Sequence, residues 1–253
     1  MRGHHNWLAA ALLLASAGTN AADGWEYSGT LYLWAAGINA KTAGGADIDV
    51  DFDTLLDNLD MAFMGAAEAR RGPWSVVADA VYLNVSADKG ATVEVPVAPD
   101  SVVPVDVDLG VKTRGWVLSL VGAYTAWANE RASLDLLAGV RYLELKAALD
   151  LQLSKGGQVQ LAGSRSVLGT AWDGVVGVKG RVRLDDRWHL PYYADIGAGE
   201  SELTWQLFAG VGYSFDWGEA SLVYRHVHWD LDSDAPLNDI SFSGPAAAVS
   251  WRF

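Results

Sequence analysis

The sequence contains no cysteine, and this absence removes several possibilities at once. The chain has no disulfide bond, no thiolate metal site, no cysteine nucleophile and no cysteine to carry a lipid anchor. Long apolar runs are also missing beyond the first 22 residues, so no later segment is long and apolar enough to cross a bilayer as a helix.

Positive charge is scarce as well. The chain has 18 Lys and Arg against 31 Asp and Glu, which gives a formal net charge of −13. Because binding to nucleic-acid phosphates requires a surplus of Lys and Arg, we exclude nucleic acid as a partner. The sequence has no phosphate-binding loop, nucleophile elbow or zinc motif, so we expect no cofactor and no metal ion.

The first residues have the order of a secretory signal peptide. Arg2 provides a positive start, residues 7–17 form a short apolar run, and Ala21 and Ala22 end a small-residue stretch suited to cleavage. The run is too short to span a bilayer as a helix. We therefore interpret residues 1–22 as a signal peptide and residues 23–253 as one domain.

What the chain does have is apolar residues spread through alternating segments, with 12 Trp and 9 Tyr. In 108–126, Trp116, Leu118 and Leu120 share one face of an extended strand, while Ser119 lies on the other. Such alternation predicts an all-β fold, a closed antiparallel up-and-down transmembrane β-barrel. Ten segments qualify, with eight as the alternative count: 25–39, 58–71, 74–88, 108–126, 132–148, 170–184, 187–198, 202–215, 219–231 and 240–253.

The connections between these segments alternate in length. Short ones are expected at 71–73, 127–131, 185–187 and 216–218, and long ones at 40–57, 89–107, 149–169 and 232–239, with a short fifth at 199–201. Outer-membrane barrels have tight periplasmic turns and longer external loops, so we expect both termini on the periplasmic side. A soluble β-sandwich is the alternative, but it does not need outward Trp and Leu on nearly every strand.

Following the alternation, charged residues of both signs point into the barrel. Since unpaired buried charge is costly, we expect these residues to form a salt-bridged network that fills a narrow lumen. A path for a small polar solute is the other interpretation. The residues are Glu26, Glu68, Arg70, Asp79, Asp135, Arg141, Asp173, Lys179, Arg181, Asp195, Arg225 and Arg252.

His226, His228 and Asp230 are candidates for acid–base chemistry, because they lie two apart and share one face of a strand. Ten-stranded outer-membrane proteases and lipid A-modifying barrels carry acid and base residues near the external rim. No Ser or second acidic pair completes such a site here, and the three residues share a face with the lipid-facing Tyr224. A polar belt at the outer interface is the favoured interpretation, and we expect the chain not to be an enzyme.

Alternating carboxylates follow the first predicted strand, in the segment 47–53. Oxygen ligands of this kind suit Ca²⁺ or Mg²⁺, but the spacing of a dedicated calcium loop is missing. We therefore favour a solvated strand extension. Alternatively, Phe52, Leu55 and Leu56 pack into the barrel mouth as a short lid.

The segments 52–74, 136–142 and 210–213 resemble a widespread group of uncharacterised proteobacterial outer-membrane barrels, similar to the outer-membrane protein A and W types. The last strand ends with Trp251 and Phe253, which resembles the sorting signal of such barrels. The resemblance implies a location in the outer membrane of Gram-negative bacteria. It also implies the barrel assembly machinery, outer-membrane lipids and lipopolysaccharide as partners, but it supplies no active site.

These features favour a porin-like outer-membrane protein with a structural role or a narrow channel for small solutes. A rim hydrolase acting on lipid A or peptides, and a surface-recognition barrel built on the acidic loops, are the alternatives.

Overall fold

The computed structural model describes residues 24–42, 47–98, 101–155, 158–231 and 237–253. The signal peptide expected at residues 1–22 lies outside the described residues, so its cleavage stays a prediction.

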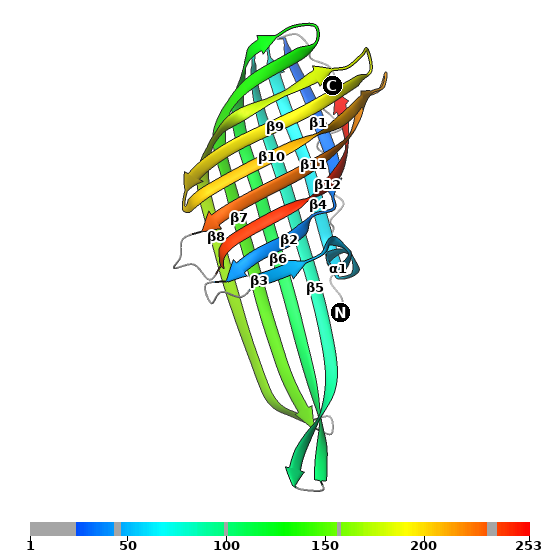
Figure 1. Cartoon of the computed structure of the whole chain (residues 1–253), viewed down its shortest axis with the longest axis vertical. Helices are drawn as coiled ribbons and strands as arrows, with labels where there is room; N and C mark the ends of the chain where they lie inside the picture. Colours follow the sequence, from blue (N-terminus) through cyan, green and yellow to red (C-terminus); the bar gives the residue numbers. More distant parts are fainter. Residues whose placement is uncertain (1–23, 43–46, 99–100, 156–157, 232–236) are drawn as a thin grey trace, which may run out of the picture.

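A single antiparallel sheet forms a closed barrel, because its first strand pairs with its last (Figure 1). Two segments, β1 and β2, both pair with β12 and act as one strand, and β3 pairs with β2 alone, so the wall has ten strands. The predicted ten-stranded barrel is confirmed, and the alternative of eight is wrong. The elements are β1 (Trp25–Trp34), β2 (Gly37–Thr42), β3 (Asp47–Val50), α1 (Phe52–Asp57), β4 (Leu59–Arg71), β5 (Trp74–Ala98), β6 (Ser101–Ala128), β7 (Ala132–Lys155), β8 (Gln158–Arg183), β9 (Trp188–Gly199), β10 (Ser201–Ser214), β11 (Glu219–Leu231) and β12 (Leu237–Arg252).

The two ends of the barrel differ. The end with the four short turns also carries the C-terminus, and we call it the turn end (Figure 1). At the turn between β8 and β9, the Asp185 carboxylate accepts hydrogen bonds from the backbone N–H groups of Trp188 and Arg187 at 2.7 and 2.8 Å. These bonds favour the charged carboxylate and lower the pKa of Asp185.

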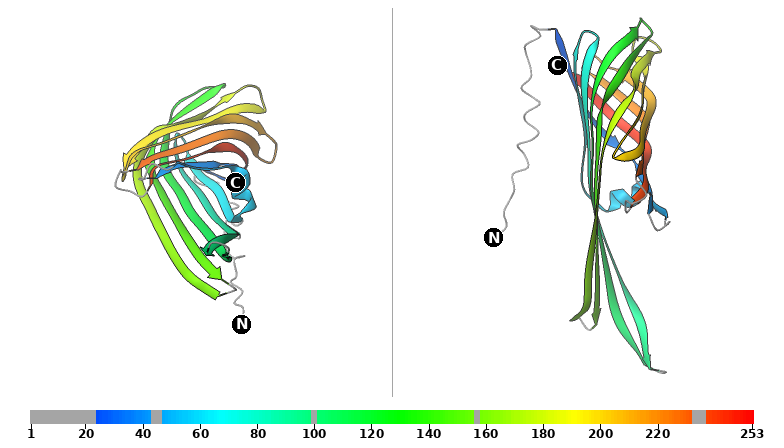
Figure 2. Two further views of the ribbon diagram at one scale, coloured as in Figure 1. Left: turned by 60° about the horizontal axis from the view of Figure 1, so that its bottom comes forward. Right: turned by 90° about the vertical axis from the view of Figure 1, so that its left-hand side faces the viewer.

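The opposite end, which we call the hairpin end, corrects part of the loop prediction. The segments 89–107 and 149–169, expected as loops, mostly continue β5 into β6 and β7 into β8 as two long hairpins (Figure 2). The register of β5 and β6 runs from Trp74↔Tyr124 to Ala98↔Ser101. Valines alternate along 93–107, and such β-branched residues favour an extended strand over a loop.

The segment 40–57 was also expected to be a loop, but it contains the β2–β3 hairpin and the helix α1. Phe52 and Leu56 lie four residues apart on one face of this helix, and Asp53 lies favourably in the first turn. Within the described ranges, no helix is long and apolar enough to cross a membrane.

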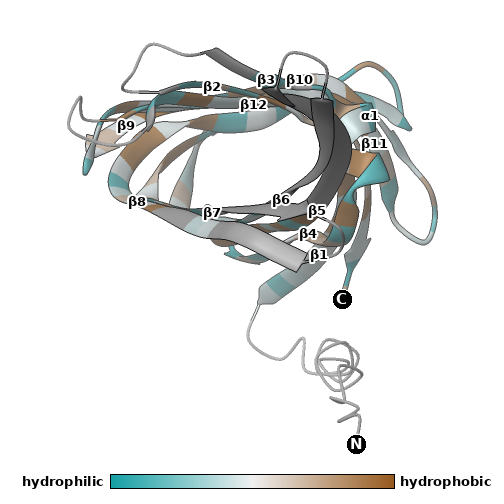
Figure 3. Ribbon diagram, turned by 90° about the horizontal axis from the view of Figure 1, so that it is seen from below, coloured by the Kyte–Doolittle hydropathy of each residue, from teal (hydrophilic) through white to brown (hydrophobic). Residues whose placement is uncertain are grey.

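The outer face of the wall is apolar. Large side chains such as Leu33, Leu120 and Leu222 are 77%, 52% and 55% exposed, and aromatic pairs such as Trp74–Tyr124 and Tyr82–Trp116 lie towards its two ends. The strands form a ring when seen from the hairpin end (Figure 3). This outer surface is what a membrane-spanning barrel presents to lipid, and it leaves the lumen as the place for buried polar groups.

Close approach of neighbouring strands requires glycine at position 139. A Cβ added at Gly139 lies 2.1 Å from the carbonyl oxygen of Leu120, whereas one added at Gly122 has no neighbour nearer than 3.9 Å. We expect Gly139→Ala to lower the yield of folded barrel sharply and Gly122→Ala to leave it unchanged. Heat-modifiable migration on gels measures the folded fraction, and equal folded fractions for both variants would contradict the prediction.

Candidate functional site

The twelve charged residues expected in the lumen all lie on inward positions of their strands, but they do not form one network. Glu26 and Arg252 lie at the turn end and are exposed. Arg252 is 74% exposed, and its Nη2 is 3.9 Å from Glu219 Oε2. Asp173 is buried but binds Ser201 through the backbone N–H and hydroxyl, at 2.9 and 2.8 Å, rather than a cation.

One network lies near the turn end. A single carboxylate oxygen of Glu68 accepts hydrogen bonds from Arg70 at 3.0 Å and from Lys179 at 2.9 Å. Arg70 also binds Asp135 at 2.7 Å, and Asp135 accepts a second bond from the Thr125 hydroxyl at 2.7 Å. Carboxylates and cations from three strands thus alternate, Thr125 adds a hydroxyl from a fourth, and each charge has an opposite neighbour.

Sequence reasoning missed two members of the neighbouring cluster. Glu219 accepts a hydrogen bond from Arg181 at 3.0 Å and lies 2.9 Å from the His189 Nε2. Both Glu219 and His189 lie on inward positions, and the alternation along β9 and β11 was the signal that could have identified them.

Arg225 is the centre of a second layer, halfway along the lumen. Its guanidinium donates to Asp79 at 2.8 Å, to the Tyr32 hydroxyl at 2.8 Å and to the Gln206 side-chain oxygen at 3.0 Å. Tyr32 in turn donates to Asp79 at 2.7 Å. Residues from four strands therefore meet across the lumen at one guanidinium, which we call the Arg225 layer.

A buried ion pair between Arg141 and Asp195 lies on the other side of the lumen, with both side chains fully inaccessible to solvent. The Tyr193 hydroxyl donates to the same carboxylate at 2.6 Å, and Arg141 donates to Thr204 at 3.2 Å. These extra hydrogen bonds compensate part of the cost of removing two charges from water.

Trp34 separates the charged region from an apolar one. Its indole ring lies 4.8 Å from the Arg225 guanidinium carbon, and the indole N–H donates to the carbonyl oxygen of Gly244 at 3.2 Å. The side chain is only 5% exposed. On the hairpin side of Trp34, a cluster of buried apolar residues faces the lumen, including Val81, Val117 and Leu143.

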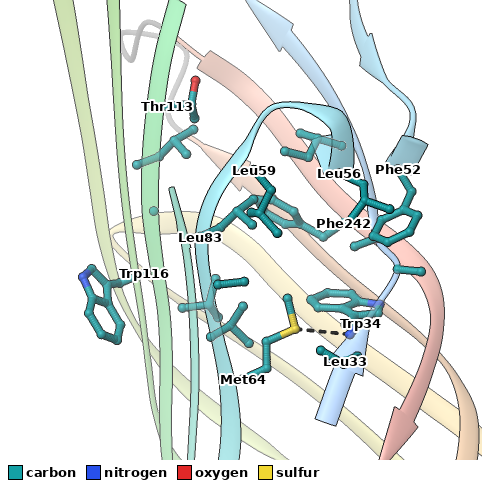
Figure 4. A pocket seen from close by; sticks show the side chains of 18 of the residues that line it. Leu33, Trp34, Phe52, Leu56, Leu59, Met64, Leu83, Thr113, Trp116 and Phe242 are labelled. Carbon is teal, nitrogen blue, oxygen red and sulfur yellow. Dashed lines mark hydrogen bonds between the residues drawn. The ribbon is translucent and has the colours of Figure 1, made fainter. Parts of the chain in front are cut away.

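These apolar residues surround a cavity of about 440 Å³, which we call the chamber (Figure 4). Its inner wall comes from Val81, Val117 and Leu143, and α1 contributes Phe52 and Leu56. Of the two interpretations of this segment, the alternative lid agrees with the structure in that Phe52 and Leu56 line the chamber, with Leu56 still 53% exposed. The Leu55 side chain lies outside the described residues. The chamber has the size and apolar lining of a small-molecule site.

A second cavity of about 260 Å³ lies nearer the turn end, between Glu68 and Arg225. It has no lining residue in common with the chamber. The Arg225 layer and Trp34 lie between the two cavities, so the lumen consists of separate compartments rather than a uniform pore.

The rim candidates lie outside this site. His226, His228 and Asp230 occupy outward positions of β11, and both imidazoles pack on Trp205 at centroid distances of 4.5 and 5.9 Å. His228 has Asp239 3.6 Å away. None of the three residues lines either of the two cavities described above.

The remaining candidates were the carboxylates of 47–53 and the C-terminal signal. Among the residues that the structure describes, no group of three or more His, Asp or Glu could hold a metal ion, and the Asp47 side chain lies outside that set. Phe253 is 57% exposed and donates its backbone N–H to the carbonyl oxygen of Tyr27, and the Trp251 ring lies tilted beside Trp217 at a centroid distance of 6.5 Å. Both aromatic residues lie near the turn end, where β12 pairs with β1.

Comparison with known proteins identifies the fold. No family model matches the chain, and no curated protein matches it. The outer membrane protease OmpT from Escherichia coli has a TM-score of 0.53 at 10% identity, over 91% of this chain and 97% of OmpT. The translocator domain of the autotransporter NalP from Neisseria meningitidis has a TM-score of 0.43 at 14% identity, over 95% of this chain and 91% of that domain.

The chain therefore has the fold of an outer-membrane β-barrel. At this identity the likeness to OmpT carries the fold alone. The narrower resemblance to the outer-membrane protein A and W types remains a prediction, because no family model supports it.

The buried ion pair gives a stability prediction. Asp195→Asn leaves the Arg141 charge buried without its counterion, and we expect the free energy of unfolding to fall by about 3–5 kcal/mol. Arg181→Gln, at a side chain that is 42% exposed, is the control and is expected to cost less than about 1 kcal/mol. Urea unfolding in lipid vesicles, followed by tryptophan fluorescence, measures both. Equal unfolding midpoints for the two variants would contradict the prediction that the buried ion pair contributes more to stability than the exposed Arg181.

Proposed function

We propose that this chain is a non-enzymatic integral outer-membrane protein that admits small apolar molecules from the hairpin end, which faces outside. The observation that carries the proposal is the chamber, an apolar cavity of about 440 Å³ inside a barrel whose deeper lumen is charged. Apolar ligands gain roughly 25 cal/mol for each Å² of surface removed from water, so such a cavity favours their entry.

The layers below the chamber argue against a water-filled pore for ions. Arg225 with Asp79, and Arg141 with Asp195, are mutually bonded across the lumen, and Trp34 covers the Arg225 layer. An ion crossing this region would have to replace bonds that the paired charges already satisfy. We therefore expect planar bilayers containing the protein to show no steady conductance.

The two alternative functions have less support. A rim hydrolase built on His226, His228 and Asp230 lacks an enclosed substrate site, since these side chains lie on the outer face of β11. A surface-recognition role would depend on the tips of the long hairpins, and nothing in the described residues favours it.

Uptake of the fluorescent apolar probe N-phenylnaphthylamine by living cells tests the proposal, because an intact outer membrane excludes the probe. We expect cells producing the protein to take it up several-fold faster than cells with an empty vector. Val117→Phe places an aromatic ring in the chamber and is expected to reduce the gain, since Val117 is buried in its wall.

The matched control is Val140→Phe, which adds the same volume at an outward position that is 43% exposed. It is expected to keep the full uptake rate. Since overpacking costs about 1–3 kcal/mol, the folded fraction of Val117→Phe is checked by heat-modifiable migration. Leu83→Phe provides a second way to narrow the chamber. Normal uptake by folded chamber-filled variants would reject the proposal.

A row of cations on the outer face supports lipopolysaccharide as a partner. Arg114 lies directly opposite Lys146 on the neighbouring strand, and Lys112 follows on the same face of β6. The Glu144 carboxylate on the same face lies 3.0 Å from the Lys146 ammonium and offsets part of this charge, so the row keeps an excess of positive charge that an anionic lipid can meet. The row lies one step beyond Tyr82 and Trp116 towards the hairpin end, the level at which lipid phosphates are expected.

We expect Arg114→Gln combined with Lys146→Gln to lower the amount of lipopolysaccharide that co-purifies with the protein by several-fold. Removing two cations weakens phosphate binding, whereas Arg181→Gln at the turn end does not. Phosphate analysis of the detergent-purified proteins gives the measurement. An unchanged lipid content in the double variant would contradict a role of these cations in binding lipopolysaccharide.

A further inference from the structure

The wall of the barrel is incomplete on one side. The ladder between β1 and β4 ends at the pair Leu31↔Gly65, although β1 continues to Trp34 and β4 begins at Leu59. Beyond that pair, β4 stays bonded to β5 and the first strand stays bonded to β12. Among the described residues, 32–34 and 59–64 have no backbone pairing with each other, and we call this region the lateral seam.

A sulfur atom takes the place of a backbone acceptor in the lateral seam. The backbone N–H of Trp34 donates to the thioether Sδ of Met64 at 3.2 Å (Figure 4). A thioether is a weak acceptor on an unbranched side chain with several rotatable bonds. Rotation of the Met64 side chain therefore breaks the one described hydrogen bond across the seam without disturbing any other strand pair.

The chamber extends to the outer face of the barrel beside this seam. Its lining includes inward residues such as Val81 and Val117, and also Leu33, Leu222 and Ala247. The last three form a row across β1, β12 and β11 on the outward face, because Leu33 pairs with Ala247 and Ala247 with Leu222. One apolar surface thus joins the lumen to the lipid-facing side of the wall.

The other way out of the chamber is polar. A molecule moving towards the turn end must pass Trp34 and the Arg225 layer, where Arg225 is bonded to Asp79, Tyr32 and Gln206. A molecule moving sideways passes Met64 and Leu33 and enters hydrocarbon. For an apolar solute the sideways path avoids displacing charge-assisted hydrogen bonds and keeps apolar surface away from water.

We propose that the lateral seam is an exit gate, through which a small uncharged hydrocarbon-like molecule leaves the chamber for the core of the membrane. Met64 is the gating side chain, and α1 covers the hairpin side of the opening with Phe52 and Leu56. The inference rests on the proposed uptake function and adds the route: entry from the hairpin end and release sideways, not through the turn end.

A covalent staple across the lateral seam tests the route. The chain has no cysteine, so an introduced pair is unique. Extending the β1–β4 register by two residues sets Leu33 opposite Phe63, both on the outward face. The variant L33C with F63C is closed by oxidation or by a short bis-maleimide. The control is Y27C with A69C, which staples the same two strands where they are already paired.

Two readouts separate the gate from the chamber. Binding of N-phenylnaphthylamine to the purified protein in amphipol reports on the chamber, and uptake by cells reports on the whole route. We expect the closed seam staple to keep binding but to lower uptake to the level of empty-vector cells. Reducing the disulfide restores uptake, and the control staple leaves both unchanged.

Two further outcomes would each overturn one proposal, either the lateral gate or the uptake function. Binding and normal uptake with the seam closed would overturn the lateral gate and leave the proposed function intact, because the probe would then leave along the lumen. Absence of probe binding by the unmodified protein would instead overturn the proposed function. Met64→Ala, which removes the sulfur acceptor, is expected to raise uptake, and an unchanged rate would remove Met64 from the gating role.

Discussion

The structure depends on a constraint of backbone hydrogen bonding. In a membrane, unpaired backbone N–H and C=O groups are costly, so a sheet is stable there only when its first and last strands pair with each other. The pairing of β1 with β12 provides this closure along seven residue pairs, from Ser28↔Arg252 to Trp34↔Ala246. The continuation of this edge by β2 and β12 lets the first strand stay bonded on one side over its whole length.

This arrangement leaves the other edge of the same strand, the edge facing β4, without backbone pairing beyond Leu31. Because β2 turns into β3 and pairs with it, the hairpin half of β4 loses the neighbour that a regular barrel would give it. Apolar side chains and α1 cover the region instead. The lateral seam is thus a consequence of how the barrel closes, and the chamber lies beside it for the same reason.

A narrow lumen imposes the second condition, that inward charges neutralise one another. Arg225 and Arg141 each meet a carboxylate from a different strand, together with neutral hydroxyl or amide partners. Such pairs hold distant strands at fixed distances. They also bound the chamber on the side of the turn end, because paired charges and their polar partners occupy the lumen there.

Much of this architecture could be predicted from the sequence, because apolar and polar residues alternate with the period of two that a strand requires. Leu118 and Leu120 indicate the outer face, and Arg141 and Arg225 then fall inside. The long hairpins were missed because outer-membrane loops were assumed to lack strands, although the valines of 93–107 indicated otherwise. The helix α1 was missed because a single turn and a half is too short to give a clear period.

The lateral seam could not be predicted from alternation, because it lies where β1 and β4 stop pairing, and alternation does not show which strands pair. Alternation in β1 and β4 is as regular beyond Leu31 and Gly65 as before them, so nothing local marks the end of their ladder. The end of the ladder is set by the pairing of β2 with β12 and with β3, which takes the chain away from β4. The contact between Met64 and the backbone N–H of Trp34 acquires meaning from that nonlocal choice, because a weak thioether acceptor on a flexible side chain takes the place of the carbonyl oxygen of a paired strand.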